Sequence, residues 1–271
     1  MTPDMPLHLR QYGDGATQVL GLHCALASGR VLQGLAAALP DSTWHVPDLP
    51  GHGRSPDWPD ETALDFHGHC ADCMVGILQN TGPAHLFGHS YGATIALRVA
   101  LDHPELVQSL TLVEPVLFAA LRGTEAYTQV IAGTTGFEQA LAAGDRLGAA
   151  QDFYTMWGGG GIPWEMLPAP VRDSWCQRIH LIQAQAPGLH DDTGGILLPG
   201  RLEGLAVPVA LVEGADSPEV ISGILDQLER RMATASRHRI AGAGHMVPLT
   251  HGSKVAQVMA EVIARSAAEA G

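Results

Sequence analysis

A serine that could act as a nucleophile lies in the segment 88–92, whose sequence is Gly-His-Ser-Tyr-Gly. An apolar Leu-Phe pair precedes this segment, and a run that favours a helix follows it. A serine on a sharp strand-to-helix turn has strained backbone angles, and small flanking residues let the strand and the helix pass closely. The hydroxyl then lies near a helix N-terminus, whose partial positive charge favours a developing anion. We expect Ser90 to be the nucleophile.

A serine hydroxyl is a weak nucleophile and needs a neighbouring imidazole that takes its proton. The chain has 14 histidines, so position along the chain has to select among them. His245 lies in Gly-Ala-Gly-His-Met (242–246), between the last expected strand and the last expected helix. A loop between these elements would bring His245 to the end of the sheet where Ser90 lies. For four other histidines near turns or near this loop we expect structural roles: His23, His52, His89 and His251.

Two carboxylates could orient the His245 imidazole and stabilise its charged form. Glu114 follows the apolar run 110–113, and Asp216 follows the run 209–213, so each carboxylate comes after an expected strand. Both satisfy the chain order serine, acid, histidine. Glu114 could instead be a hinge residue, and Asp216 could cap a helix. These residues alone leave the choice of acid open.

Two backbone N–H groups are candidates for an oxyanion hole. Tyr91 supplies one, directly after the serine. The second is expected from the loop 23–28, which follows an early strand, with Ala25 preferred and Leu26 next. A donor aimed at the position where charge develops is worth about 3 kcal/mol.

These residues need a scaffold, and the chain indicates a mainly parallel α/β sheet. Short apolar runs bounded by turn residues alternate with longer segments of helical periodicity. Strands are expected at 7–12, 17–22, 44–48, 85–89, 109–113, 207–213 and 236–241. Helices are expected at 29–39, 64–79, 92–102, 218–232 and 253–268.

The stretch 117–201 breaks this alternation. It contains Trp157, Trp164 and Trp175, and four consecutive glycines at 158–161. We interpret it as a mostly helical cap, or lid, over the strand ends, because such loops suit gating and substrate contact. The alternative is a lobe that merely fills out the domain. The core would then comprise residues 1–116 and 202–271.

Composition excludes several classes of function. The chain has 271 residues, of which 46% are hydrophobic, and its net charge is −13. This charge argues against nucleic acid and against an acidic membrane surface as partners. No signal peptide or membrane-spanning segment is expected, so we expect a cytoplasmic protein. In that compartment its four cysteines are expected to be free thiols. We expect either a monomer or a homodimer. We expect no cofactor and no metal ion, although the spacing of His67, Cys70 and Cys73 also allows a zinc site as an alternative.

Along nearly its whole length the chain resembles the α/β-hydrolase superfamily. The matching segments are 23–25, where cysteine replaces the usual glycine of a His-Gly-x loop, the turn 48–55, the serine segment 88–92, and the segments 112–115 and 242–246. The resemblance implies an α/β-hydrolase fold, which is a mainly parallel, doubly wound sheet with a helical cap insertion. It also implies a nucleophile at Ser90, which excludes the chemistry of dehalogenases and epoxide hydrolases, since these need an aspartate.

The resemblance also bears on the acid. The family's acid usually lies after the seventh strand, in Gly-x-x-Asp-Pro, but here the segment 214–218 has a serine at that position and Asp216 one place early. Other members carry a glutamate after the strand that the family counts as its sixth, and Glu114 falls at that position. We therefore prefer Glu114 and keep Asp216 as the alternative.

The predicted activity is acyl transfer from a small-molecule carboxylic ester to Ser90, followed by hydrolysis. Carbon–carbon bond hydrolysis, lactone opening and perhydrolysis are variants of the same machinery. A small-ligand receptor on this fold and a cofactor-free lyase are the alternatives from other classes.

Overall fold

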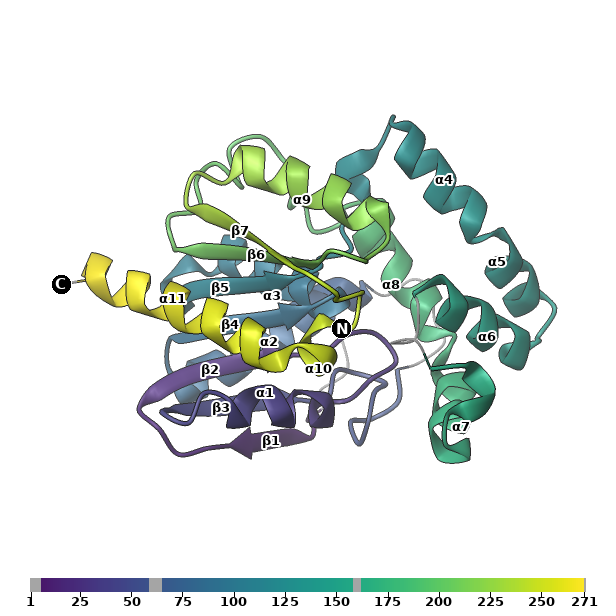
Figure 1. Ribbon diagram of the computed structural model, residues 1–271, viewed down its shortest axis with the longest axis horizontal. Coiled ribbons are helices and arrows are strands. Elements are labelled where there is room, and N and C mark those ends of the chain that lie inside the picture. The colour runs from purple at the N-terminus through teal and green to yellow at the C-terminus, as the bar shows by residue number, and fades with distance from the viewer. Residues whose placement is uncertain (1–5, 59–64, 158–161, 271) are drawn as a thin grey trace.

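The computed structural model describes residues 6–58, 65–157 and 162–270. A seven-stranded sheet in the order β1-β3-β2-β4-β5-β6-β7 forms its centre (Figure 1). β1 pairs antiparallel with β3, and the remaining neighbours pair in parallel. The strands are β1 (Leu9–Tyr12), β2 (Thr17–Leu22), β3 (Ser42–Pro47), β4 (Ala84–His89), β5 (Val107–Val113), β6 (Val209–Gly214) and β7 (Ala235–Ile240). All seven strands lie where the sequence predicts them.

Helices cover both faces of the sheet, because successive strand residues are apolar on both sides. Val19 and Val212 pack with helices α1 and α11, whereas their neighbours Leu20 and Leu211 pack with α2, α3 and α9. Figure 1 shows α1 and α11 in front of the sheet and α2 and α3 behind it. The bounds are α1 (Gln33–Ala37), α2 (Phe66–Thr81), α3 (Tyr91–Asp102), α9 (Glu219–Arg231), α10 (Val247–Thr250) and α11 (Gly252–Ala270).

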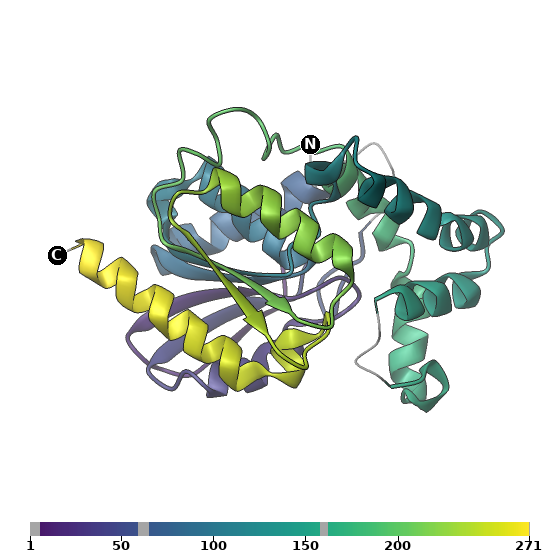
Figure 2. The ribbon, with the colours of Figure 1, turned by 45° about the horizontal axis from the view of Figure 1, so that its top comes forward.

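The connection from β5 to β6 forms a helical cap. In Figures 1 and 2 its helices α4 to α7 lie beyond one end of the sheet, and α8 leads back toward it. Their bounds are η3 (Phe118–Leu121), α4 (Glu125–Gly133), α5 (Thr135–Ala142), α6 (Arg146–Met156), η5 (Trp164–Met166), α7 (Ala169–Arg178) and α8 (Leu181–His190). The glycine run 158–161 lies outside the described residues.

The expected helix at 29–39 is divided. A 3-10 helix, η1 (Gly29–Leu32), precedes α1. Gly29 lies close to β3, since a Cβ atom there would lie 2.7 Å from Val46 Cγ1. Its N–H donates to Asp48 Oδ1 at 2.7 Å. This tight start holds the first turn against the sheet and precedes the regular helix.

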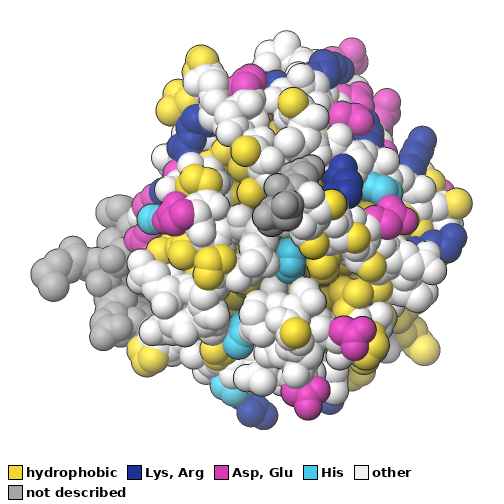
Figure 3. Space-filling view, turned by 90° about the vertical axis from the view of Figure 1, so that its left-hand side faces the viewer, with side chains coloured by type: hydrophobic (Ala, Val, Ile, Leu, Met, Phe, Trp, Pro, Cys, Tyr) yellow, Lys and Arg dark blue, Asp and Glu magenta, His cyan; other side chains and the backbone are white. Residues whose placement is uncertain are grey.

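The surface opposite the cap carries interspersed basic, acidic and hydrophobic side chains (Figure 3). Among the helices in the described part of the chain, none combines the length and apolarity that a membrane crossing requires.

Candidate active site

Ser90 occupies a strained turn between β4 and α3. Its φ is 56° and its ψ is −118°, a conformation that non-glycine residues rarely adopt. Its neighbours at 88 and 92 have to be glycine, because a Cβ atom at Gly88 would lie 2.5 Å from the Ala93 Cα atom. A Cβ atom at Gly92 would lie 2.5 Å from the Leu22 carbonyl oxygen. The turn therefore places the serine side chain at the carboxyl end of the sheet.

His245 reaches Ser90 from the loop between β7 and α10. Its Nε2 atom lies 3.1 Å from Ser90 Oγ, and its Nδ1 atom lies 2.5 Å from Glu114 Oε2. Both side chains of this second contact are buried. His89 fixes the loop, because its ring nitrogen Nε2 lies 2.8 Å from the His245 carbonyl oxygen. The three groups form a continuous hydrogen-bonded chain from hydroxyl to carboxylate.

Glu114 is held in place by two groups at the end of the neighbouring strand β6 and just after it. Its Oε1 atom accepts hydrogen bonds from the Gly214 N–H, at 2.7 Å, and from the Ser217 hydroxyl. Burial alone would raise the pKa of Glu114, but the hydrogen bond and the charge of His245, together with these two donors, lower it below its usual value. Glu114 also has a positive φ of 49°, directly after β5. The site thus favours an ionised carboxylate beside the imidazole.

Asp216, the alternative acid, lies elsewhere. Its side chain is exposed, and its carboxylate has no hydrogen bond to any residue that the structure describes. Its backbone N–H donates to the Ala243 carbonyl oxygen at 2.9 Å. The geometry favours Glu114 over Asp216 as the partner of His245.

The two expected oxyanion donors border the same space as Ser90. Tyr91 is the first residue of α3, so its N–H has no partner within the helix. Ala25 lies in the loop after β2, and within the described residues its N–H donates to no backbone carbonyl. Its neighbour Leu26 has a positive φ of 58°. Ala25, Leu26, Tyr91, Ser90 and His245 all line one cavity.

His23 fixes the loop that carries Ala25. Its Nε2 atom accepts the Leu49 N–H at 3.0 Å, so the proton is on Nδ1, which lies 2.7 Å from the Cys24 carbonyl oxygen. Burial lowers the pKa of His23 to about 4. The neutral ring therefore joins this loop to the turn after β3, a structural role in agreement with the expectation. His52 and His251 also make local contacts, to Pro50 and Thr250.

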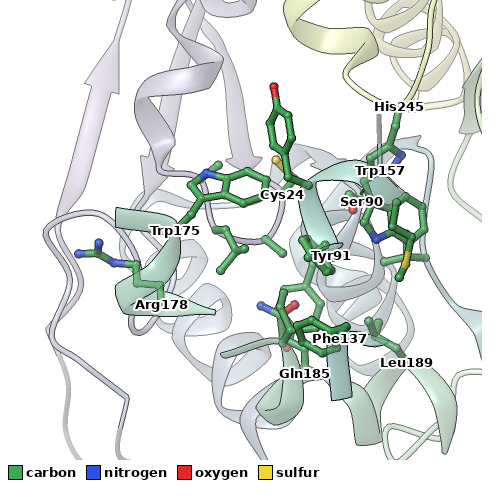
Figure 4. Close-up of a pocket in the computed structure, with 18 of the residues that line it drawn as sticks. Cys24, Ser90, Tyr91, Phe137, Trp157, Trp175, Arg178, Gln185, Leu189 and His245 are labelled. Atoms are coloured by element: carbon green, nitrogen blue, oxygen red, sulfur yellow. Dashed lines mark hydrogen bonds between the residues drawn. The ribbon is translucent and has the colours of Figure 1, made fainter. Parts of the chain in front are cut away.

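The cavity has a volume of about 1240 Å³ and lies between the sheet end and the cap. Figure 4 shows its labelled residues around Ser90 and His245. Aromatic and aliphatic side chains form most of its wall, among them Phe118, Val130, Phe137, Phe153, Trp157 and Trp175.

None of the cap residues that line this cavity was among the predicted site residues, and these include Trp157, Arg178 and Gln185. The Trp157 ring lies 4.7 Å from the His245 ring, tilted by 41°. Arg178 donates to the carbonyl oxygens of Gly51 and Gly53, at 3.0 and 3.2 Å, and thereby joins the cap to the core. Two features of the sequence could have pointed to these residues as cavity residues. Trp157 directly precedes the glycine run, and the amide of Gln185 lies within an apolar helix face.

The two cysteines of the alternative zinc site pack in or against the core. Cys70 is buried among the side chains between α2 and the sheet, and Cys73 Sγ lies 3.6 Å from His69 Nε2. His67 contacts Thr94 and Arg98, at 3.2 Å each. In residues 6–58, 65–157 and 162–270, no group of three or more His, Cys, Asp or Glu side chains could hold a metal ion.

Comparisons with known proteins agree with this architecture. The profile of the alpha/beta hydrolase fold family matches residues 18–252. The chain is 28% identical over 270 residues to Lipase LipV of Mycobacterium tuberculosis, covering 93% of this chain and 96% of the lipase. It is 30% identical over 240 residues to a pimeloyl-[acyl-carrier protein] methyl ester esterase of Methylococcus capsulatus, covering 81% and 83%.

Among solved structures, the esterase EaEST of Exiguobacterium antarcticum superposes with a TM-score of 0.74 at 17% identity, covering 96% of each chain. This likeness concerns the fold, whereas the profile match extends over most of the sequence. The chain belongs to the alpha/beta hydrolase fold family.

Proposed function

We propose that the protein is a serine hydrolase that cleaves small-molecule carboxylic esters. The observation that carries this proposal is the hydrogen-bonded chain from Ser90 through His245 to Glu114, which opens onto a cavity of about 1240 Å³. The relatives named as a lipase and as a methyl ester esterase support ester hydrolysis as the reaction class.

In the first half of the reaction, His245 Nε2 takes the proton of Ser90 as Oγ attacks the ester carbonyl carbon. The N–H groups of Tyr91 and Ala25 stabilise the negative charge on the carbonyl oxygen. Glu114 stabilises the imidazolium. His245 then gives its proton to the leaving alcohol, and the acyl group stays on Ser90.

In the second half, His245 takes a proton from a water molecule, which attacks the acyl-enzyme. The tetrahedral intermediate collapses, the carboxylic acid leaves, and Ser90 regains its proton from His245. The ester and one water molecule supply all the atoms of the two products.

The cavity favours a bulky, apolar acyl group. Its volume exceeds the roughly 300–1,000 Å³ that is usual for small-molecule sites. We expect kcat/KM for p-nitrophenyl esters to rise from acetate to octanoate.

The cap comprises residues 117–201 in this proposal, and the core comprises 1–116 and 202–271.

The test combines turnover with labelling of the nucleophile. Wild-type protein should hydrolyse p-nitrophenyl octanoate and react with a fluorophosphonate probe, and Ser90→Ala should lose both. Ser253→Ala removes an exposed serine of α11 and serves as the matched control with unchanged activity. A wild-type protein that binds esters without turnover would refute the hydrolase and favour a receptor.

A further inference from the structure

The loop that carries the second oxyanion donor has an unusual residue at its turn. Residues 24–27 form a turn that is closed by a hydrogen bond of 3.4 Å from the Ala27 N–H to the Cys24 carbonyl oxygen. The third residue of this turn, Leu26, has a positive φ of 58°. Turns with a positive φ at the third residue usually have glycine or asparagine there, because other side chains are strained. The leucine at this position therefore needs a physical reason.

The backbone of Leu26 does not supply this reason. Its N–H and its carbonyl oxygen form no backbone hydrogen bond with any residue that the structure describes. The ring of His23 fixes the start of the loop, and the hydrogen bond from the Gly29 N–H to Asp48 fixes its end. Between these two points, the turn depends on a hydrogen bond that is longer than the usual length of roughly 2.7–3.2 Å.

The side chain of Leu26 is buried in the cap, where it is only 3% exposed. All the other buried residues that the structure describes in its apolar cluster belong to the cap: Phe137, Ala149, Ala150, Tyr154, Trp164 and Ile179. Figure 4 shows Trp175 of α7, which packs against the same cluster, on the same side of Ser90 as Cys24. Leu26 thus anchors a loop of the core in the cap.

This anchor lies directly beside the expected donor. Ala25, whose N–H is to stabilise the oxyanion, precedes Leu26 in the turn and packs against both the main core cluster and the cap cluster. If Leu26 returned to a negative φ, the path of the backbone would change on both sides of it, and Ala25 would move. A donor has to lie about 2.7–3.1 Å from the oxyanion, so a small displacement already lowers the stabilisation of the transition state.

We infer that Leu26 is a positioning residue: its side chain, held in the cap, keeps the Ala25 N–H directed at the oxyanion, so that the cap completes the oxyanion hole. The inference rests on the proposed ester hydrolase function. It gives the cap a part in stabilising the transition state, in addition to its part in enclosing the substrate.

The experiment compares three substitutions at position 26, with rates on p-nitrophenyl octanoate per active site titrated by a fluorophosphonate. Leu26→Ala removes the anchor and should lower kcat/KM about 10- to 100-fold, which is less than the roughly 10²- to 10³-fold loss for a donor that is absent altogether. Leu26→Gly adopts a positive φ without strain but also lacks the anchor, so it should lose as much. Leu26→Met fills a similar volume and should retain kcat/KM within about threefold.

A second readout separates the transition state from the ground state. An octyl trifluoromethyl ketone adds to Ser90 and places an oxyanion in the hole, so its inhibition constant should rise in Leu26→Ala by the same factor by which kcat/KM falls. The affinity of the octanoate ester for Ser90→Ala, measured by calorimetry, should change less than about twofold when Leu26→Ala is added.

Leu141→Ala is the matched control, because Leu141 packs against the same cap cluster but lies outside the loop and is not a cavity residue. It should lower the Tm, as Leu26→Ala does, and leave kcat/KM and the inhibition constant of the ketone within about twofold of the wild type. Wild-type inhibition by the ketone in Leu26→Ala or Leu26→Gly would overturn the role of Leu26, and so would an equal loss in Leu141→Ala. Absence of turnover in the wild type would instead count against the hydrolase.

Discussion

Replacing Glu114 by glutamine tests the arrangement of the site with a change of a single group. The carboxylate is fully buried, and its two oxygens have different partners. Oε1 accepts the Gly214 N–H and the Ser217 hydroxyl, and Oε2 contacts His245 Nδ1. An amide nitrogen cannot take the place of Oε1, because it would face the N–H of Gly214, which has no freedom to turn.

The amide nitrogen of Glu114→Gln must therefore face His245 Nδ1. It then donates to Nδ1, so the imidazole proton moves to Nε2, the atom that has to accept the proton of Ser90. The tautomer is wrong for catalysis, and the stabilising charge is lost as well. We expect kcat to fall by about 10³- to 10⁴-fold, which corresponds to about 4–5.5 kcal/mol.

The assay is single-substrate kinetics on p-nitrophenyl octanoate, with circular dichroism to show that the variant is folded. Asp216→Asn is the matched control and should change kcat less than twofold, because Asp216 is exposed. If Glu114→Gln kept activity within tenfold while Asp216→Asn lost it, the acid would be Asp216, and the reasoning from the buried geometry would be wrong.

Three other measurements test parts of the same structure. Trp157→Ala should lower kcat/KM about tenfold through loss of the ring contact with His245, and Trp157→Phe should retain more of the wild-type kcat/KM. If both variants had the kcat/KM of the wild type, the contact would have no role. Gly92→Ala should lower the free energy of unfolding in urea by about 3 kcal/mol, since its Cβ meets the Leu22 carbonyl oxygen, whereas Gly76→Ala, with no atom within 4 Å, should not destabilise. The free energy of unfolding should also fall as the pH drops below 6.5, by about 1.4 kcal/mol per pH unit for each fully buried imidazole. The reason is that the unfolded imidazole binds a proton near pH 6.5, whereas the folded one binds it only near pH 3 to 4. A free energy of unfolding that stays constant between pH 7 and 4 would contradict this. The imidazoles concerned are those whose pKa burial lowers most: His23, His52, His67 and His89.

The sequence alone predicts the fold well, because each strand is a short apolar run that ends at a turn residue. Ser90 and His245 could be selected from the same pattern, since both follow strands whose carboxyl ends meet at one edge. The choice of acid could not be made from this pattern, because Glu114 and Asp216 satisfy the same chain order. The contact with His245 distinguishes Glu114, together with the backbone turn at this residue and its two donors, Gly214 at the end of β6 and Ser217 after it.

The cap was the part that periodicity could not resolve. Its side chains face a cavity as well as a core, so Gln185 and Trp157 have neighbours that no local pattern reveals. Arg178 is another example, since its partners at Gly51 and Gly53 are more than 120 residues away in the chain.

The pairing of β5 with β6 has a consequence for how such a site can change over evolutionary time. Val113 and Val212 are register partners, so Glu114 and the segment that follows β6 lie side by side at the same edge of the sheet. Ser217 donates to the carboxylate that Glu114 supplies, whereas the neighbouring Asp216 is exposed. A change of acid from position 114 to the segment after β6 would therefore require that segment to turn a carboxylate toward His245.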